Sequence, residues 1–210
     1  MIIGKQPECE YPKNCIPINT NVLTFNFSDF AAFHKERTGR LFDVIMMDPP
    51  WQLSSSSPTR GVAIGYDTLP DFSIRTLPFT CLQEDGFLFI WTINAKFSLC
   101  LQMMKEWGYT YIDDICWIKA SVNGKIAKGH GYYLQHSKET CLIGCKGNPW
   151  PRVQKGKIED CIFSKRRGQS QKPNDIYDMI ENFIPDGYYV EIFGRRNNLR
   201  DGWITIGNEL

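Results

Sequence analysis

An apolar segment that ends in a carboxylate and two prolines constrains the fold of this chain more than any other feature. Residues 42–47 are almost all apolar and rich in strand formers, which predicts a central strand covered on both faces. Pro49 and Pro50 end that strand after Asp48, because proline donates no hydrogen bond to a sheet ladder. Pro49 also disfavours helix at Asp48, so we expect a stiff extended turn there. Open α/β sheets bind ligands at the carboxyl ends of their strands.

The tetrad Asp48-Pro49-Pro50-Trp51 has groups that methylation of an aromatic amine requires. The lone pair of the exocyclic amine of adenine is delocalised into the ring. The Asp48 carboxylate and the Pro49 carbonyl can each accept a hydrogen bond from one N–H of that amine, which directs its lone pair toward a methyl donor. Trp51 offers a face for the base, and such stacking contributes ~1–3 kcal/mol. The alternative is a structural Pro-Pro turn with a surface tryptophan.

Length and charge set the class of protein. A chain of 210 residues predicts one domain with a single core. Hydrophobic residues make up 42% and charged residues 22%, as is usual for globular proteins. The formal net charge of +1 excludes a strongly basic nucleic-acid binder, so any grip on phosphates is expected to be local or supplied by partners.

The cysteines and the apolar segments indicate the redox environment of the protein and whether it associates with membranes. The 8 cysteines include no C-x-x-C pair, and several lie in apolar runs, where a thiol acts as a small hydrophobe. This favours a reducing, intracellular setting over a disulfide framework or structural zinc, and we expect no metal site. The apolar stretches fall short of a membrane span and the start lacks a signal-peptide core, so we expect no membrane association.

The order of apolar patterns predicts an α/β domain over residues 21–210, after an extended arm over residues 1–20. Residues 22–25 are a possible first strand, and a helix capped at Ser28 and Asp29 is expected to end by Gly39, with His34 on its surface. Further on, strands alternate with helices, which predicts right-handed crossovers and a mainly parallel sheet flanked by helices. The expected later strands are residues 86–93, 109–119, 140–145, 158–163 and 188–193, and the expected later helices are 94–107 and 174–183.

Three segments lack an apolar period. Residues 52–70, which include Tyr66, form a loop long enough for a lid over a site. Residues 121–138 are polar and rich in glycine, as in a solvated hairpin or a partner interface. Residues 165–172 are basic and lead to a helix start at Pro173, and they can hold a phosphate or a cofactor carboxylate.

The candidate cofactor turn lies late in the chain. A methyltransferase needs S-adenosylmethionine, which most Rossmann-like enzymes bind with a glycine-rich turn after their first strand. No such turn precedes Asp48, and the one candidate follows residues 188–193 at Gly194. The catalytic and cofactor motifs therefore stand in permuted order.

Two motifs together resemble the MT-A family of adenine-N6 methyltransferases. They are the D-P-P-W tetrad after an apolar strand and the tail made of residues 193–198 and 203–208. The likeness extends from about residue 21 to 210. It implies a Rossmann-like fold with permuted motifs, S-adenosylmethionine as cofactor, and methylation of the N6 amine of adenine in nucleic acid. The family acts on messenger RNA and, in ciliates, on DNA, and this sequence looks most similar to the DNA branch.

The resemblance also assigns site residues. Arg195 and Asn198 match residues that hold the cofactor ribose, and Lys172 matches one that pairs with its methionine carboxylate. Three positions depart from the usual family residue, namely Asn21 for Asp, Asn197 for His and Glu209 for Gln, and all three keep hydrogen-bonding capacity. The complete cofactor set is Asn21, Val22, Asp48, Lys172, Phe193, Arg195, Asn197, Asn198, Asn208 and Glu209, and Trp51, Tyr66 and Glu139 are expected on the acceptor side.

The family likeness implies partners as well. Residues 131–139 match the segment with which relatives dock on an inactive methyltransferase-like paralogue, so we expect a heterodimer. The resemblance also implies further DNA-binding subunits and a nuclear location. The sequence itself contains no recognisable organelle-targeting signal. The complete tetrad favours an active subunit. The alternatives are the same reaction on messenger RNA and a non-catalytic scaffold that binds nucleic acid. Methylation of a protein amide is disfavoured, because Asp48 and Trp51 stand where such enzymes have Asn and Tyr.

Overall fold

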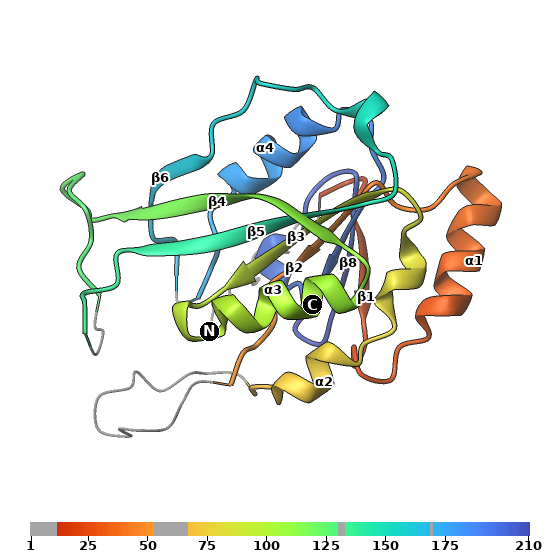
Figure 1. Cartoon of the computed structure of the whole chain (residues 1–210), viewed down its shortest axis with the longest axis horizontal. Coiled ribbons are helices and arrows are strands. Elements are labelled where there is room, and N and C mark those ends of the chain that lie inside the picture. The colour runs from red at the N-terminus through yellow and green to blue at the C-terminus, as the bar shows by residue number, and fades with distance from the viewer. Residues whose placement is uncertain (1–11, 53–66, 130–132, 169) are drawn as a thin grey trace, which may run out of the picture.

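The computed structural model of this chain describes residues 12–52, 67–129, 133–168 and 170–210. Within these residues one sheet of 8 strands runs through the molecule, in the order β1-β8-β7-β2-β3-β5-β4-β6 (Figure 1). The strands are β1 (Ile16–Asn19), β2 (Val44–Met47), β3 (Gly86–Thr92), β4 (Thr110–Ala120), β5 (Lys138–Lys146), β6 (Cys161–Lys165), β7 (Tyr189–Ile192) and β8 (Trp203–Gly207).

The sheet is mainly parallel, as the sequence predicted. Every neighbouring pair of these strands is parallel except the two that include β5. The segments that became β4 and β5 are antiparallel neighbours, in agreement with the hairpin interpretation of residues 121–138. Antiparallel neighbours can be joined by a loop that turns back, whereas a parallel neighbour needs a crossover connection, usually through a helix.

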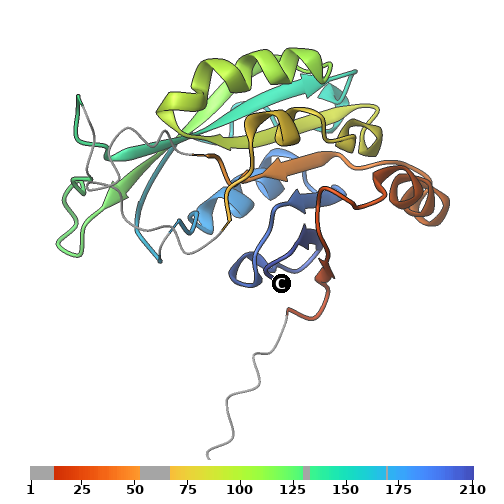
Figure 2. The ribbon, with the colours of Figure 1, turned by 90° about the horizontal axis from the view of Figure 1, so that it is seen from below.

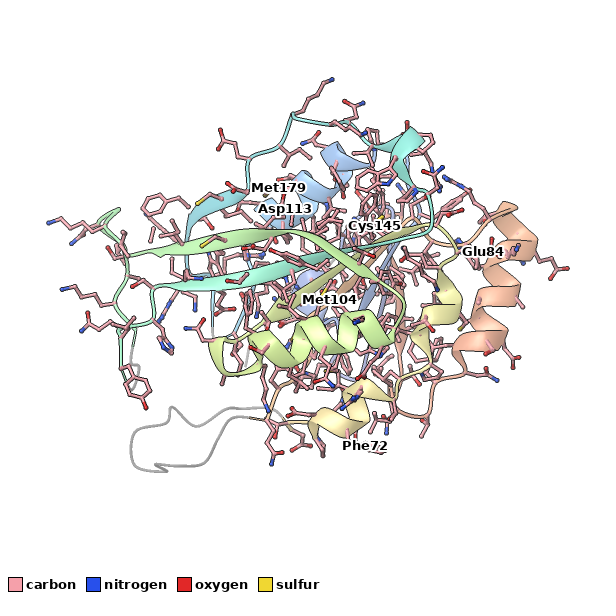
Figure 3. The ribbon with its side chains drawn as sticks, viewed as in Figure 1. Phe72, Glu84, Met104, Asp113, Cys145 and Met179 are labelled. Atoms are coloured by element: carbon pink, nitrogen blue, oxygen red, sulfur yellow. The ribbon has the colours of Figure 1, made fainter. Side chains whose placement is uncertain are left out.

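Helices cover both faces of the sheet. They are α1 (Phe27–Thr38), α2 (Asp71–Arg75), α3 (Phe97–Glu106) and α4 (Asp175–Phe183), with short 3₁₀ turns at Phe79–Leu82, Asn94–Lys96, Trp150–Arg152 and Arg196–Asn198. Figure 2 shows the sheet from its edge, with α3 on one side and α4 on the other. In Figure 3, Met104 of α3 and Met179 of α4 lie on these two sides, where each packs against a different core cluster.

The residues of β2 alternate between the two cores. Ile45 and Met47 pack on the α3 side, and Val44 and Met46 pack on the α4 side, all at most 2% exposed. Successive side chains of a strand point to opposite faces, so a strand that is apolar at every position belongs in the middle of a covered sheet. The prediction of a buried central strand before Asp48 is confirmed. Trp91 and Trp107 are buried too, as expected.

Helix α1 differs from its prediction in two details. Asn26, rather than Ser28, caps the helix, and its side-chain oxygen accepts a hydrogen bond from the Asp29 N–H. Gly39 ends the helix in the left-handed region at φ 81°. His34 was expected on the helix surface, but it is buried and its ring stacks on Phe42 with 3.9 Å between centroids. Burial lowers the pKa of His34, and nearby Arg40 lowers it further.

The N-terminal region is partly as expected. Residues 16–19, the end of the predicted arm, are extended and pair with β8 as strand β1, while residues 1–11 lie outside the described residues. The possible strand at residues 22–25 is wrong. Asn21 starts a turn there, since its side-chain oxygen accepts from the Leu23 N–H at 2.9 Å and its carbonyl accepts from the Thr24 N–H at 3.1 Å. Asparagine favours such turns because its side chain mimics the backbone.

Two kinds of feature are absent from the described part of the chain. No helix there combines the length and the apolar character that a membrane span requires. The same residues contain no group of three or more His, Cys, Asp or Glu side chains placed to hold a metal ion.

Candidate active site

Three parallel strands deliver the predicted site residues to one edge of the sheet. Strands β2 and β7 pair in register, Met47 opposite Ile192, so Asp48 and Phe193 both follow at the same edge. Strand β8 runs parallel to β7 and ends at Gly207, which brings Asn208 to this edge as well. Parallel strands place their carboxyl ends together, which is why residues far apart in the sequence meet here.

A cavity of about 490 Å³ opens at this edge, within the usual range of small-molecule sites. Its lining includes seven of the ten residues predicted to hold the cofactor. Lys172, Asn197 and Asn198 are not among the lining residues. Leu23, Asp67, Leu69 and Gly194 also line it and were not predicted as site residues. The full lining is Asn21, Val22, Leu23, Asp48, Pro50, Asp67, Leu69, Phe193, Gly194, Arg195, Asn208 and Glu209.

Asp67 and Leu69, which were not predicted, reach the cavity because the chain returns to the turn at residues 48–51, called the catalytic turn here after its predicted role. The Leu69 N–H donates to the Pro50 carbonyl at 2.8 Å, and Leu69 forms an isolated parallel bridge with Trp51. Nothing in the local sequence marks this pairing, since it joins the two sides of a long loop. Tyr66, expected on the acceptor side, lies outside the described residues, as do residues 53–66 as a whole.

Glycine is required where the ends of β7 and β8 meet. A Cβ on Gly194 would lie 2.1 Å from the Thr205 methyl carbon, and one on Gly207 would lie 2.1 Å from the Gly194 carbonyl oxygen. Phe193 also has a positive φ of 66°, which turns the chain sharply after β7. This close approach lets the Arg195 side chain pair with Glu209 at 3.4 Å on the wall of the cavity.

Lys172 lies between two carboxylates at the catalytic turn. Its Nζ is 3.0 Å from the Asp48 Oδ2 and 3.1 Å from the Glu139 Oε2. Glu139 in turn accepts a hydrogen bond from Lys119 through its other oxygen. These four residues form the charged network of the site, which runs from β4 and β5 to the end of β2.

The pKa values of this network follow from burial and from the partners. Burial alone would lower the pKa of Lys172, but Asp48 and Glu139 outweigh it and raise that pKa. Burial opposes ionisation of Glu139, yet Lys172 and Lys119 hold its pKa below the ordinary value. At Asp48 burial prevails over the attraction of Lys172, and its pKa is raised. The carboxyl at the catalytic turn is therefore more basic than an ordinary aspartate.

Trp51 has a different environment from the one expected. It is buried at 5% exposure, and its indole N–H donates to the Trp91 carbonyl at 3.0 Å. In this structure its ring packs in the α3-side core, so it fastens the turn to β3 and presents no open stacking face. The Pro49 carbonyl accepts from the Trp51 N–H at 2.8 Å and keeps a second lone pair for another donor.

A second buried set of polar groups supports the candidate cofactor turn at residues 193–198, below called the cofactor turn. The Tyr177 hydroxyl donates to Glu191 Oε2 at 2.9 Å and accepts from Asn198 Nδ2 at 3.0 Å. The Asn198 side-chain oxygen accepts from the Arg195 N–H at 3.3 Å. Burial raises the pKa of Glu191 to about 8, so this relay carries no net charge near neutral pH. Tyr177 and Glu191 were not predicted as site residues, and buried polar positions on a strand and a helix were the only signal for them.

Asn197 is close to the cavity in sequence but does not line it. Its Nδ2 is buried and has no hydrogen-bond partner among the described residues. A buried amide without a partner is unusual, and it marks the turn at residues 195–198 as a place where a polar group remains unsatisfied.

Comparison with known proteins identifies relatives of the chain. The profile of the MT-A70 family matches residues 42–209. The human "N(6)-adenosine-methyltransferase catalytic subunit METTL3" is 39% identical over 171 residues, which cover 80% of this chain and 28% of the relative. The "N(6)-adenosine-methyltransferase MT-A70-like" protein of Arabidopsis thaliana is 35% identical over 184 residues, 87% of this chain and 25% of the relative. The chain thus spans little more than a quarter of these relatives.

A more distant relative has a different role in its name. The "N(6)-adenosine-methyltransferase non-catalytic subunit METTL14" of Drosophila melanogaster is 26% identical over 205 residues, which cover 87% of this chain and 50% of the relative.

Proposed function

The chain belongs to the MT-A70 family, and from that premise we propose that it transfers a methyl group from S-adenosylmethionine to the N6 amine of adenine in nucleic acid. One observation carries the proposal. Asp48 lines the cavity at the carboxyl ends of β2, β7 and β8 and also belongs to the charged network with Lys172 and Glu139. A carboxylate in that position can face a bound cofactor on one side and an acceptor base on the other.

The residues around the cavity fit the proposed cofactor. Asn21, Arg195, Asn208 and Glu209 line it with hydrogen-bonding groups, and Val22 adds an apolar side chain. When bound, S-adenosylmethionine supplies an electrophilic methyl group. Hydroxyls of a ribose are matched by amide, guanidinium and carboxylate side chains, which can both donate and accept. Lys172 does not line the cavity, but it pairs with Asp48, which does, and it can pair with the carboxylate of the cofactor instead.

Asp48 acts on the acceptor amine in this proposal. Its oxygens accept an N–H of the amine, and the Pro49 carbonyl accepts the other with its remaining lone pair. The amine loses a proton after the methyl group is attached. A carboxyl whose pKa is raised by burial is a stronger base toward that proton than an exposed aspartate. Lys172 holds one oxygen of the Asp48 carboxylate at 3.0 Å, and it also pairs with Glu139.

RNA and DNA are the two candidate substrates. The sequence favoured DNA as the main interpretation and messenger RNA as the alternative. The names of the catalytic relatives specify adenosine, the ribonucleoside, and this supports the RNA alternative better than the DNA interpretation. We therefore place RNA first and retain DNA as the second candidate.

Two basic segments support a nucleic-acid substrate. Residues 121–138 and 164–172 contain no acidic residue, although the whole chain has a net charge of only +1. The two segments adjoin, since a Cβ on Gly129 would lie 3.4 Å from an Arg166 guanidinium nitrogen. Clustered Lys and Arg side chains bind phosphates with little dependence on base sequence. Apart from the buried Lys172, their cationic residues are Lys125, Lys128, Lys138, Lys165, Arg166 and Arg167.

We also propose that the hairpin between β4 and β5 binds a second methyltransferase-like subunit. Val122, Ile126, Tyr133 and Leu134 are between 57% and 90% exposed on it. A group of exposed apolar side chains on one projecting segment is typical of a protein interface. The existence of a relative named as a non-catalytic subunit supports a heterodimer with an inactive paralogue. Further nucleic-acid-binding subunits and a nuclear location belong to the same proposal.

The deciding experiment measures transfer of labelled methyl from S-adenosylmethionine to single-stranded RNA and to duplex DNA, side by side, with the chain and its native companions. Label in RNA adenine would support the first substrate, and label only in DNA adenine would support the second. If neither nucleic acid is labelled and the chain also fails to bind S-adenosylmethionine in calorimetry, the catalytic proposal is wrong and a scaffold role takes its place.

A further inference from the structure

Two cysteines face each other at the outer edge of the sheet. Cys116 in β4 and Cys161 in β6 are directly paired in parallel register. The next pair along the same strands, Trp117 and Ile162, is buried in the α4-side core. Successive side chains of a strand point to opposite faces, so Cys116 and Cys161 both point away from that core and lie on the same face.

Neither cysteine is fully buried. Cys161 is exposed, and Cys116 is half-buried. The other cysteines in the described part of the chain are placed differently. Cys100, Cys141 and Cys145 are buried, and Cys15 and Cys81 lie outside the strands, so neither has a cysteine as a strand partner.

The spacing of the strands permits a bond between the two sulfurs. Neighbouring strands lie ~4.7–4.9 Å apart, and the Cα atoms of a disulfide are usually ~4.4–6.8 Å apart. The Cβ atoms of a disulfide are closer, at ~3.5–4.5 Å, so closure must draw β6 toward β4. β6 is the last strand in the sheet order, and β4 is its one paired neighbour among the described strands. The edge strand can therefore shift without breaking a second ladder.

We propose that Cys116 and Cys161 are a redox modification site that forms a reversible disulfide by exchange with a low-molecular-weight disulfide. The Cys161 thiolate attacks one sulfur of that molecule, whose S–S bond breaks and releases one thiolate, which takes up the proton lost by Cys161. The Cys116 thiolate then attacks the Cys161 sulfur and expels the second small thiolate, which takes up the Cys116 proton. Two protein thiols become one disulfide, and the small disulfide is reduced to two thiols.

The order of the two steps follows from the surroundings. Burial raises the pKa of Cys116, and Cys161, Asp114 and Asp160 raise it further, while Lys138 opposes them. The thiolate is the reacting form, so the exposed Cys161 reacts first and Cys116 closes the ring. Closure requires β6 to move toward β4 and leaves the bond at an accessible edge, so we expect thiols to reduce it readily, as in a regulatory rather than a structural disulfide.

The bond would act on the proposed active site through the chain itself. β6 ends at Lys165, and the following residues lead directly to Lys172. A covalent link from β6 to β4 restricts the start of that segment. We expect slower amide hydrogen exchange in β6 of the oxidised protein than in the reduced protein.

The test treats the native full-length chain with oxidised glutathione, quenches with acid and alkylating agent, and maps the peptides by mass spectrometry. We expect a peptide pair linked through Cys116 and Cys161, loss of two titratable thiols, and reversal by dithiothreitol. C116S should retain glutathione on Cys161 as a mixed disulfide, because the second step is missing. C161S should leave Cys116 reduced.

A matched control separates pairing from simple thiol exposure. C81S removes a half-buried cysteine that has no cysteine as a strand partner, and it should form the Cys116–Cys161 link as the wild type does. The same reaction in urea should lose its preference for this pair. Stable glutathione on Cys161 of the native wild type, or a lack of reaction at Cys161, would overturn the proposal.

Discussion

The site contains two buried polar networks that differ in charge. The charged network joins Lys119, Glu139, Lys172 and Asp48 through ion pairs. The relay of Glu191, Tyr177 and Asn198 is joined by hydrogen bonds and is neutral near neutral pH, because Glu191 has a pKa of about 8. The first network ends at the catalytic turn, and the second ends at the cofactor turn.

The difference indicates what each network can do. An ion pair of Lys172 can exchange one carboxylate for another, so the charged network can open when a charged ligand arrives. The relay offers no charge to exchange, and each member has its partner inside the fold. It therefore fixes the Arg195 backbone for as long as the protein is folded. The four predictions that follow test this division, from the largest expected effect to the smallest.

Asp48→Ala should reduce methyl transfer by at least about 10³-fold, because it removes the proposed acceptor of the amine N–H. The fold should persist, since Asp48 lies at the end of a strand and not in either core. Turnover and far-ultraviolet circular dichroism of the same preparation check both points. Asp114→Ala, at a carboxylate on the outer part of β4, is the matched control and should keep wild-type turnover. Full turnover of Asp48→Ala would remove Asp48 from the mechanism.

Lys172→Met should weaken S-adenosylmethionine binding by about 100-fold and lower the free energy of unfolding by about 3 kcal/mol. Removal of one member of a buried ion pair leaves its partners uncompensated, here Asp48 and Glu139. Calorimetric binding and urea unfolding give the two numbers. Lys119→Met is the comparison, since it leaves the Lys172–Asp48 pair intact and should affect binding less. Equal losses in the two variants would contradict the special place of Lys172.

Tyr177→Phe should weaken cofactor binding by about 10-fold and lower the free energy of unfolding by about 1–3 kcal/mol, because Glu191 and Asn198 each lose a partner. Tyr189→Phe is a close control. Its hydroxyl is also buried and donates to the Ile184 carbonyl at 2.5 Å, but it has no link to the cofactor turn. Both variants should lose stability, and the affinity for S-adenosylmethionine should fall in Tyr177→Phe alone. An unchanged affinity there would limit the relay to a structural role.

Glu191→Gln should change the dependence of stability on pH more than stability itself. The folded pKa of Glu191, about 8, exceeds its ordinary value of 4.5. Between these values the unfolded chain releases this proton and the folded chain keeps it, so the contribution of Glu191 to stability is complete below 4.5 and declines as pH rises toward 8. Urea midpoints at about pH 5, 6.5 and 8 should fall less steeply in Glu191→Gln than in the wild type. Parallel curves would show that Glu191 is ionised in the folded protein.

The sequence was informative where one local pattern determines one structure. The apolar segment before Asp48 became β2, and the apolar face of Ile176, Tyr177 and Ile180 became the buried side of α4. The helix end at Gly39 followed from the freedom of glycine at positive φ. The relation of Asp48 to the tail was predictable from the motifs, because parallel strands bring their carboxyl ends together.

The sequence was less informative where contacts between distant segments determine the structure. The hairpin interpretation of residues 121–138 agrees with the antiparallel pairing of β4 and β5, but no local signal placed β5 between β4 and β3. Lys172 was expected to face the cofactor, but its ion pairs with Asp48 and Glu139 join residues 124 and 33 positions away, which no periodicity reveals. Trp51 was expected to be open to a base, but its burial and its hydrogen bond to the Trp91 carbonyl place it in the core.

The parallel pairing of β1 with β8 determines where attached groups would emerge. Near the start of the described chain, Asn14 bonds with Asp201 and Gly202, just before β8 begins. At the other end, the side chain of Asn19, the last residue of β1, donates to the Leu210 carbonyl at 3.1 Å. Asn14 therefore lies at the edge opposite the cavity, and Leu210 lies beside it. A fluorophore attached through a cysteine introduced at position 14 would leave the mouth of the cavity open, whereas one attached at position 210 would crowd the ligands.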